Sequence, residues 1–482
     1  MNSRNTRKTG AALPQKRVEQ QRAADRTPHS KAEPGDIRQA PPEISSTLFS
    51  TPPKDTLKYL EEFGAIVQGV LPLSGKQRKE LPHIIRDLSR QMTDERSRRR
   101  AGYMNETGLL SAYIRYFMWW NLIRLVPIFA GLAGFAPEDG SVMLDIGSGP
   151  LTVPAALWLA RPELRKRNLT WYCLDQSQTA LAAGENIFLA LAARTGGEPW
   201  KILRVKGGPG TEIRRKADFI TCANMFNELY WDSREPLEAL VKKYSAGLLA
   251  YADESARVFI AEPGIPQGGR FMTLMRDSLI RKGYGIAAPC PHEGECSMPG
   301  KRFGTSSGGK WCHFTFPAEN APKTLRKLSE EAGLTKERAA ISLLFAVKMN
   351  GEKSVPDGDT AVPDTEKTLP VRIVSDLIFL GGEKAGTPAD GDRARGAGRY
   401  GCSALGLTLA GGAGKAGYTA GMLKSGDLIE VPLPDKNAPK DAKTGAILVQ
   451  PVTGETEVSG ENAPRSPRPS RGQSRSSGRY RR

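Results

Sequence analysis

A strand-like run that passes directly into a glycine turn constrains the fold of this chain more than any other feature. Val142 to Ile146 have the length and the largely apolar character of a buried strand. Gly147 and Gly149 follow at once, and a helix is expected to begin near Thr152. Because strand, glycine turn and helix in this order form a crevice at the carboxyl edge of a parallel sheet, we expect a ligand to bind there.

The same alternation of short apolar runs and helical patterns continues beyond this turn. Four further strands are expected at Trp171 to Leu174, Ile202 to Val205, Phe219 to Cys222 and Val258 to Ala261. Helices are expected near Pro154 to Ala160, Ala180 to Ala193, Glu235 to Tyr244 and Phe271 to Lys282. The alternation predicts βαβ units and an α/β fold with a largely parallel, Rossmann-like sheet.

The rest of the chain divides by pattern and composition. Apolar residues at three- and four-residue spacing predict an N-terminal helical domain, and both chain ends are polar, basic and predicted to be disordered. Short strand-like runs between Gly, Pro and Asp predict a small C-terminal β domain, with strands at Val371 to Val374, Leu428 to Val431 and Ala446 to Val449. The predicted parts are a basic arm (1–50), a helical domain (51–135), a ligand-binding domain with cysteine motifs (136–350), a β domain containing Cys402 (365–455) and an arginine-rich tail (456–482).

The residues of the glycine turn indicate which ligand the crevice takes. A dinucleotide site needs a third glycine where this chain has Thr152, and Asp145 would place a carboxylate beside the pyrophosphate. The pattern suits S-adenosylmethionine, which carries a cationic amino acid end and no phosphate, with Gly147 and Gly149 in the turn. The second strand ends in Asp175, which can accept hydrogen bonds from ribose hydroxyls. A purely structural glycine turn is the alternative interpretation.

Polar residues after the fourth strand are the candidates for substrate contact. Asn224, Asn227 and Glu228 follow that strand, and the two asparagines could instead close the cofactor pocket. Methyl transfer from a sulfonium needs mainly in-line positioning, so no dedicated base is required. The chain has no D/N-P-P-Y box, and Cys222 is expected to be a buried strand residue. Glu262, after the fifth strand, either lines the substrate entrance or merely turns the chain.

Four of the six cysteines lie outside the strand series and form a candidate metal site. They are Cys290, Cys296, Cys312 and Cys402, and two of the four histidines, His292 and His313, stand in the same motifs. Thiols that gather in a reducing compartment are typical metal ligands. Zinc accepts Cys and His, whereas four thiolates also satisfy an iron-sulfur cluster, and the spacing leaves both metals open. Plain burial of the cysteines is the alternative to metal binding.

The charge of the chain indicates the class of its partner. A formal net charge of +17 and a pI near 9.6 favour a polyanion, because Lys and Arg release counterions from phosphate backbones. A stretch of four arginines could touch phosphate or could be a solvated helix end: Arg96, Arg98, Arg99 and Arg100. The most apolar segment, 109–132, contains Arg115, Asn121 and Arg124, so we expect a buried or groove-facing helix and no membrane span.

The motifs together resemble a known family. The sequences D-I-G-S-G-P, N-E-L, E-P-G, C-P-H and W-C-H-F occur in this order between about Thr56 and Gly412. They are similar to those of the methyltransferase-like proteins of the mitochondrial small ribosomal subunit and their bacterial relatives. The resemblance implies a class I methyltransferase fold and an S-adenosylmethionine pocket formed by Asp145, Gly147, Gly149 and Asp175.

The same resemblance implies a four-iron four-sulfur cluster held by Cys290, Cys296, Cys312 and Cys402. It further implies a factor that acts on the small ribosomal subunit and its rRNA, either by methylation or as a noncatalytic assembly factor. A methyltransferase for a non-RNA substrate is the third hypothesis. The protein is expected to be a monomer. It is expected in the cytoplasm or, in a eukaryote, in the mitochondrial matrix, because the first thirty residues contain no apolar signal-peptide core.

Overall fold

The computed structural model describes residues 42–93, 102–132, 134–231, 233–300, 310–349, 367–380 and 396–451. All of these residues belong to one compact unit, Ala40–Arg482. The predictions of a disordered tail over 456–482, of disorder over 1–41 and of a phosphate-binding stretch at Arg96 to Arg100 lie outside the described residues.

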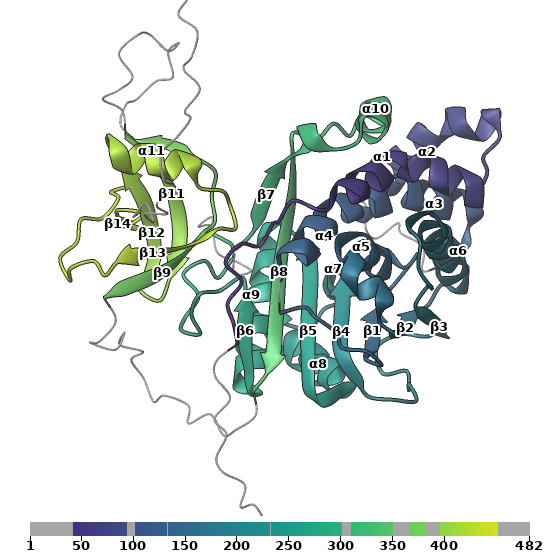
Figure 1. The fold of residues 1–482 in the computed structure, drawn as a ribbon, viewed down its shortest axis with the longest axis horizontal. Coiled ribbons are helices and arrows are strands. Elements are labelled where there is room, and N and C mark those ends of the chain that lie inside the picture. The colour runs from purple at the N-terminus through teal and green to yellow at the C-terminus, as the bar shows by residue number, and fades with distance from the viewer. Residues whose placement is uncertain are drawn as a thin grey trace, which may run out of the picture. The chain divides into compact units, whose positions relative to one another are not determined.

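Within the described residues, eight strands form a mixed sheet whose order is β3-β2-β1-β4-β5-β8-β6, with β7 paired to β8 (Figure 1). Strands β1 to β5 are parallel, and β8 runs antiparallel to β5 and β6. The prediction of a largely parallel α/β sheet is therefore confirmed. The strands are β1 (Val142–Ile146), β2 (Thr170–Asp175), β3 (Lys201–Lys206), β4 (Ala217–Ala223), β5 (Ala252–Pro263), β6 (Tyr284–Ala288), β7 (Phe314–Pro317) and β8 (Arg338–Lys348).

Helices cover both faces of this sheet. Every residue of β1 is buried, and successive side chains enter different cores, Met143 on one face and Leu144 on the other. One face packs against α5 (Thr152–Ala160) and α6 (Gln178–Thr195). The short η4 helix (Pro162–Lys166) lies between α5 and β2 in the chain. The other face packs against α7 (Phe226–Trp231), α8 (Leu237–Leu249) and α9 (Pro266–Arg281).

The N-terminal helices extend the first of these two cores. Trp119 is buried there, and its indole Nε1 donates to the carbonyl oxygen of Leu60 at 2.8 Å. Arg115 is also buried and donates to the Leu71 carbonyl oxygen at 2.6 Å, so the predicted buried helix is confirmed. No helix in the described part of the chain is long and apolar enough to span a bilayer. The elements are α1 (Lys54–Val70), α2 (Gly75–Thr93), η2 (Tyr103–Asn105), α3 (Thr107–Ala112), the π-helical η3 (Tyr113–Met118), α4 (Trp119–Gly131), η5 (Ala318–Asn320) and α10 (Lys323–Glu331).

A second sheet forms nearer the C-terminus, with six strands in the described residues. Its order is β13-β9-β11-β12-β14, and β10 pairs with β11. The strands predicted here are present, whereas β10 and the glycine-rich β11 and β12 were not predicted. Strands β11 and β12 contain several glycines and few large apolar side chains, which weakens their strand pattern. The elements are β9 (Thr368–Ile373), β10 (Ile378–Leu380), β11 (Gly396–Ser403), β12 (Gly406–Gly412), α11 (Lys415–Met422), β13 (Leu428–Pro432) and β14 (Ile447–Val449).

The predicted basic arm ends earlier than expected. We expected disorder through residue 50, but residues 42–50 are packed against both sheets. The Leu48 side chain is fully buried, and its backbone N–H donates to the Gly426 carbonyl oxygen at 3.1 Å. The ring of Phe49 lies 5.9 Å from that of Phe314. Burial of these two apolar side chains offsets the entropy of ordering the segment.

Candidate functional site

The glycine turn after β1 has a backbone that only certain residues can adopt. Gly147 and Gly149 have φ angles of +71° and +51°, in the left-handed region that favours glycine. A Cβ atom on Gly147 would lie 2.7 Å from the Cβ atom of Met225, which is closer than van der Waals contact. Leu151, with a φ of +57°, adopts the same strained region just before α5. The turn therefore brings the backbone close to the loop after β4.

Asp145 lies beneath this turn and holds it in place. Its carboxylate accepts hydrogen bonds from Ser148 Oγ at 2.6 Å and from Thr221 Oγ1 at 2.8 Å. Burial raises the pKa of Asp145 to about 7, although the two hydroxyl donors lower it. The carboxylate is thus occupied by protein groups, and Asp145 is not among the residues that line the neighbouring cavity.

Asp175, at the end of β2, links the turn to the next helix. Its Oδ2 atom accepts from the Gly149 N–H at 2.9 Å, and its Oδ1 atom accepts from the Ser177 N–H at 2.8 Å. Ser177 caps α6 by accepting from the Ala180 N–H at 3.1 Å, and it donates to Asn105 Oδ1 at 2.8 Å. Burial raises the pKa of Asp175, and its three backbone donors partly offset that increase.

A cavity of about 310 Å³ opens at the carboxyl ends of β1, β2 and β3. Of the candidate site residues, Gly147, Asp175 and Glu228 line it, whereas Asp145, Gly149, Asn224 and Asn227 do not. Most of the cavity wall was not predicted from the sequence. A second glycine turn after β3 could have been found by the rule that identified the first. The missed lining residues are Gly102, Tyr103, Met104, Leu174, Gln176, Ser177, Gly207, Gly208, Pro209, Met225 and Leu229.

The loop after β4 is held by a buried glutamate. Asn224 has a φ of +56°, a conformation that asparagine tolerates better than most residues, and its N–H donates to the Ala261 carbonyl oxygen. Glu262 accepts from the N–H groups of Phe226 at 2.9 Å and Asn227 at 3.1 Å, at the start of α7. Burial raises the pKa of Glu262 to about 8. Glu262 thus caps α7, and neither of the two roles expected for it describes this contact.

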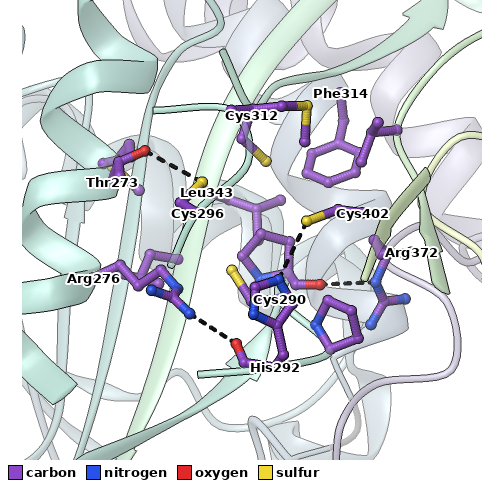
Figure 2. A pocket seen from close by; sticks show the side chains of 16 residues that line it. Thr273, Arg276, Cys290, His292, Cys296, Cys312, Phe314, Leu343, Arg372 and Cys402 are labelled. Atoms are coloured by element: carbon purple, nitrogen blue, oxygen red, sulfur yellow. Dashed lines mark hydrogen bonds between the residues drawn. The ribbon is translucent and has the colours of Figure 1, made fainter. Parts of the chain in front are cut away.

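The four candidate cysteine ligands line one pocket, shown in Figure 2. Cys290 and Cys296 lie in the loop after β6, Cys312 precedes β7, and Cys402 comes from β11 of the second sheet. All six cysteines of the chain are described, and all carry free thiols. His292 also lines the pocket, whereas His313 stacks on Trp311 with ring centroids 4.8 Å apart.

Contacts within this pocket are short and its thiols are desolvated. The Nε2 atom of His292 lies 3.4 Å from the Sγ atom of Cys402, and the Thr273 hydroxyl lies 3.8 Å from the Sγ atom of Cys296. Burial raises the pKa of Cys402 to about 12 and also raises the pKa of Cys290. The same burial lowers the pKa of His292 to about 4, with a smaller contribution from nearby Arg276. Without a metal, these groups are therefore neutral.

Two buried guanidinium groups join the segments around the cysteines. Arg276 of α9 donates at 2.8 Å to the carbonyl oxygens of His292 and Gly294. Arg372 of β9 lies opposite Cys402 in the strand ladder and donates to the carbonyl oxygens of Pro289, Gly426 and Ser45 at 2.8, 2.8 and 2.6 Å. Arg372 thus connects the N-terminal segment, the cysteine loop and the second sheet, a role with no local sequence signal.

No group of three or more His, Cys, Asp or Glu side chains in the described ranges is arranged to hold a single metal ion. The structure therefore brings the four cysteines into one pocket without converging them on one point.

The sheet order, the glycine turn after β1 and the acidic residue at the end of β2 define a class I methyltransferase-like protein, as expected from the resemblance. Residues 128–373, just over half of the chain, match the family model described as mitochondrial small ribosomal subunit Rsm22. The chain belongs to this family and is a methyltransferase-like ribosomal factor.

Solved structures with partial similarity are methyltransferases. Magnesium protoporphyrin IX methyltransferase from Synechocystis PCC 6803 is 14% identical, with 55% of this chain and 99% of that chain covered and a TM-score of 0.31. The 16S rRNA methyltransferase KamB is 12% identical, with 44% and 89% covered and a TM-score of 0.27. Scores this low support no conclusion about ligand or substrate. A comparison with curated proteins found no match.

Proposed function

We propose that this protein binds S-adenosylmethionine and acts on the rRNA of the small ribosomal subunit. The observation that carries the proposal is the cavity at the carboxyl ends of β1 to β3, with Asp175 on one wall and Glu228 on another. Its volume of about 310 Å³ lies within the usual range of roughly 300–1,000 Å³ for small-molecule pockets. Among the described residues, two carboxylates and no lysine or arginine line it, which suits a cationic ligand without phosphate.

Asp175 is placed to hold the ribose. A carboxylate has about four lone-pair sites, and three of those on Asp175 are used by backbone N–H groups, among them those of Gly149 and Ser177. The remaining site can accept from a ribose hydroxyl. Gly147 lets the ligand approach the backbone closely, and Asp145 preserves that turn from below through Ser148. Asp145 and Gly149 therefore serve the cofactor indirectly.

The loop after β4 is the candidate acceptor site. Glu228 lines the cavity, and its negative charge favours a cationic sulfonium nearby. Asn224 and Asn227 lie on the same loop, and the buried Oδ1 atom of Asn227 has no hydrogen-bond partner among the described residues. We assign Asn224, Asn227 and Glu228 the role of orienting the methyl acceptor. The methyl group itself is supplied by the bound cofactor, so these residues need only align the two reactants.

We further propose that Cys290, Cys296, Cys312 and Cys402 hold a four-iron four-sulfur cluster, with zinc as the alternative metal. In such a cluster each thiolate binds a different iron, so the four sulfur atoms need not meet at one point. The pocket fits this donor set, because it combines four thiols with the buried cations Arg276 and Arg372. Metal binding would deprotonate the thiols despite their raised pKa values.

The proposal is tested by incubating the pure protein with methyl-labelled cofactor and immature small subunits. Label in the rRNA is expected, and tight cofactor binding without label would leave the noncatalytic assembly factor as the function. Substituting Asp175 separates these two functions, because an assembly role independent of methyl transfer survives loss of the cofactor. A methyltransferase for a non-RNA substrate would show no salt-dependent RNA binding in gel shifts at two salt concentrations. We propose that the protein acts as a monomer in the cytoplasm or, in a eukaryote, in the mitochondrial matrix.

A further inference from the structure

A basic groove lies between α8 and α9, separate from both pockets described above. It encloses about 450 Å³. Val241, Leu274 and Ser278 are among its lining residues, and Ser278 is already bonded to Ser245, with 2.8 Å between the two hydroxyl oxygens. The charged lining residues are Glu238, Lys242, Arg281 and Lys282. We call this feature the α8–α9 groove.

The charge of the α8–α9 groove is strongly positive. Lys242, Arg281 and Lys282 are exposed, and in the described part of the chain none of them has an ion pair within 4.0 Å. Lys348 adds a fourth cation, because its Nζ atom donates to the Lys282 carbonyl oxygen at 2.9 Å. The one acid of the lining, Glu238, is paired with Arg270 at 2.8 Å. The groove therefore presents uncompensated cations to solvent.

The topology places these cations at the edge of the sheet opposite the cofactor cavity. Helix α9 begins after the carboxyl end of β5 and returns to the amino edge, where it ends at Arg281 and β6 begins at Tyr284 (Figure 1). Lys348, the last residue of antiparallel β8, pairs with Tyr284 at that same edge. Asp175, by contrast, ends a parallel strand at the carboxyl edge. A ligand in the groove would thus not occupy the methyl-transfer site.

We propose that the α8–α9 groove binds the sugar-phosphate backbone of small-subunit rRNA and anchors the protein while the cofactor cavity faces another part of the subunit. Three facts favour RNA over an acidic peptide or an anionic membrane: the net charge of +17, the unpaired cations along one groove, and membership in a small-subunit family. This inference rests on the proposed action on rRNA, and it assigns the RNA contact to named residues.

The test uses the full-length protein, a fluorescently labelled small-subunit rRNA transcript and anisotropy titrations over a series of salt concentrations. The variant carries K242E, R281E and K282E. A matched control carries K76E, R78E and K79E on exposed positions of α2, with the same change in net charge. Each lost phosphate contact reduces the magnitude of the slope of log K against log salt by about 0.7 to 0.9. Loss of three contacts should therefore reduce the slope of the groove variant by roughly 2 to 3.

We expect the groove variant to bind RNA at least tenfold more weakly than the wild type, with the α2 variant much less affected. S-adenosylmethionine affinity and melting temperature should stay unchanged in both, which shows that the fold is intact. Equal losses in the two variants, or an unchanged salt slope in the groove variant, would overturn the groove assignment while leaving RNA binding itself intact. Absence of RNA binding by the wild type would refute the proposed function instead. Binding to anionic vesicles but not to RNA would identify a membrane surface and also overturn the assignment.

Discussion

Replacing Gly184 by alanine tests how closely α6 packs against the glycine turn. A Cβ atom on Gly184 would lie 2.5 Å from the carbonyl oxygen and 2.7 Å from the Cα atom of Pro150, next to Gly149. Ordinary contact begins at about 3.4 Å, so helix and turn must separate by close to 1 Å. Because the obstacle is backbone and cannot rotate away, the overpacking cost should reach about 3 kcal/mol, the upper end of its usual range.

Alanine also has an intrinsic advantage in helices that offsets part of this cost. Replacing a helical glycine by alanine favours the helix by up to about 1 kcal/mol, so the net loss in unfolding free energy should be about 2 kcal/mol. Displacement of the turn should also weaken the bond between the Gly149 N–H and Asp175. We therefore expect S-adenosylmethionine to bind about tenfold more weakly, which corresponds to roughly 1.4 kcal/mol.

Gly247 of α8 provides the matched control. It is also a helical glycine, but a Cβ atom there meets no heavy atom within 4 Å. G247A should leave cofactor affinity unchanged and stabilise the protein slightly. Denaturant unfolding and calorimetric titration of the cofactor measure both effects. If G184A were as stable as G247A and bound the cofactor equally well, the reasoning about the turn would be wrong.

Three further substitutions test the other parts of the site. Asp175→Asn should weaken S-adenosylmethionine binding at least tenfold in calorimetry, because an amide offers one accepting oxygen instead of two. It should also lower the melting temperature, because both carboxylate oxygens of Asp175 accept from buried backbone N–H groups. Burial raises the pKa of Glu262 from 4.5 to about 8, so the folded state holds a proton that the unfolded state has lost, and the unfolding free energy should fall as pH rises between these values. Glu262→Gln should remove this contribution to the pH dependence of the unfolding free energy, which is at most about 1.4 kcal/mol per pH unit. Denaturant melts from pH 5 to 8, roughly the range over which the pKa is shifted, measure the difference. Cys402→Ser should lower the iron content and the visible absorbance of anaerobically purified protein, whereas Cys222→Ser, in a strand outside the pocket, should not.

Each of these tests has an outcome that contradicts it. Unchanged cofactor affinity in the Asp175 variant would remove the ribose contact from the proposal. If the unfolding free energies of wild type and Glu262→Gln depended identically on pH, Glu262 would titrate at its ordinary pKa. Asp145 also contributes to the pH dependence in this range, but it is present in both proteins. A colourless wild-type protein with stoichiometric zinc would exclude the iron-sulfur cluster and support the alternative metal.

Local sequence patterns predicted the strand series well, because β1, β2, β4 and β5 contain short apolar runs that are buried on both sides. Strand β3, at the edge of the sheet, has no buried residue. The predicted β1, Val142 to Ile146, coincides with the observed strand. Strand β8 was not predicted, although it lies between β5 and β6 and reverses direction there. Its position depends on pairing with strands more than fifty residues away, and no local pattern contains that information. The boundary of the basic arm differed for the same reason, since Leu48 and Phe49 are ordered by contacts with residues far along the chain, among them Gly426 and Phe314.

The candidate site divides in the same way. The strand pattern alone placed Gly147 and Asp175 at the ends of adjacent parallel strands, because parallel topology brings all carboxyl ends to one edge. It also identified the four cysteines by composition. The fold was needed to show that Asp145 is held by Thr221, that Met104 forms a cavity wall, and that Cys402 reaches the other cysteines from a second sheet. These contacts join segments far apart in the chain, and they arise from packing that residue spacing does not encode.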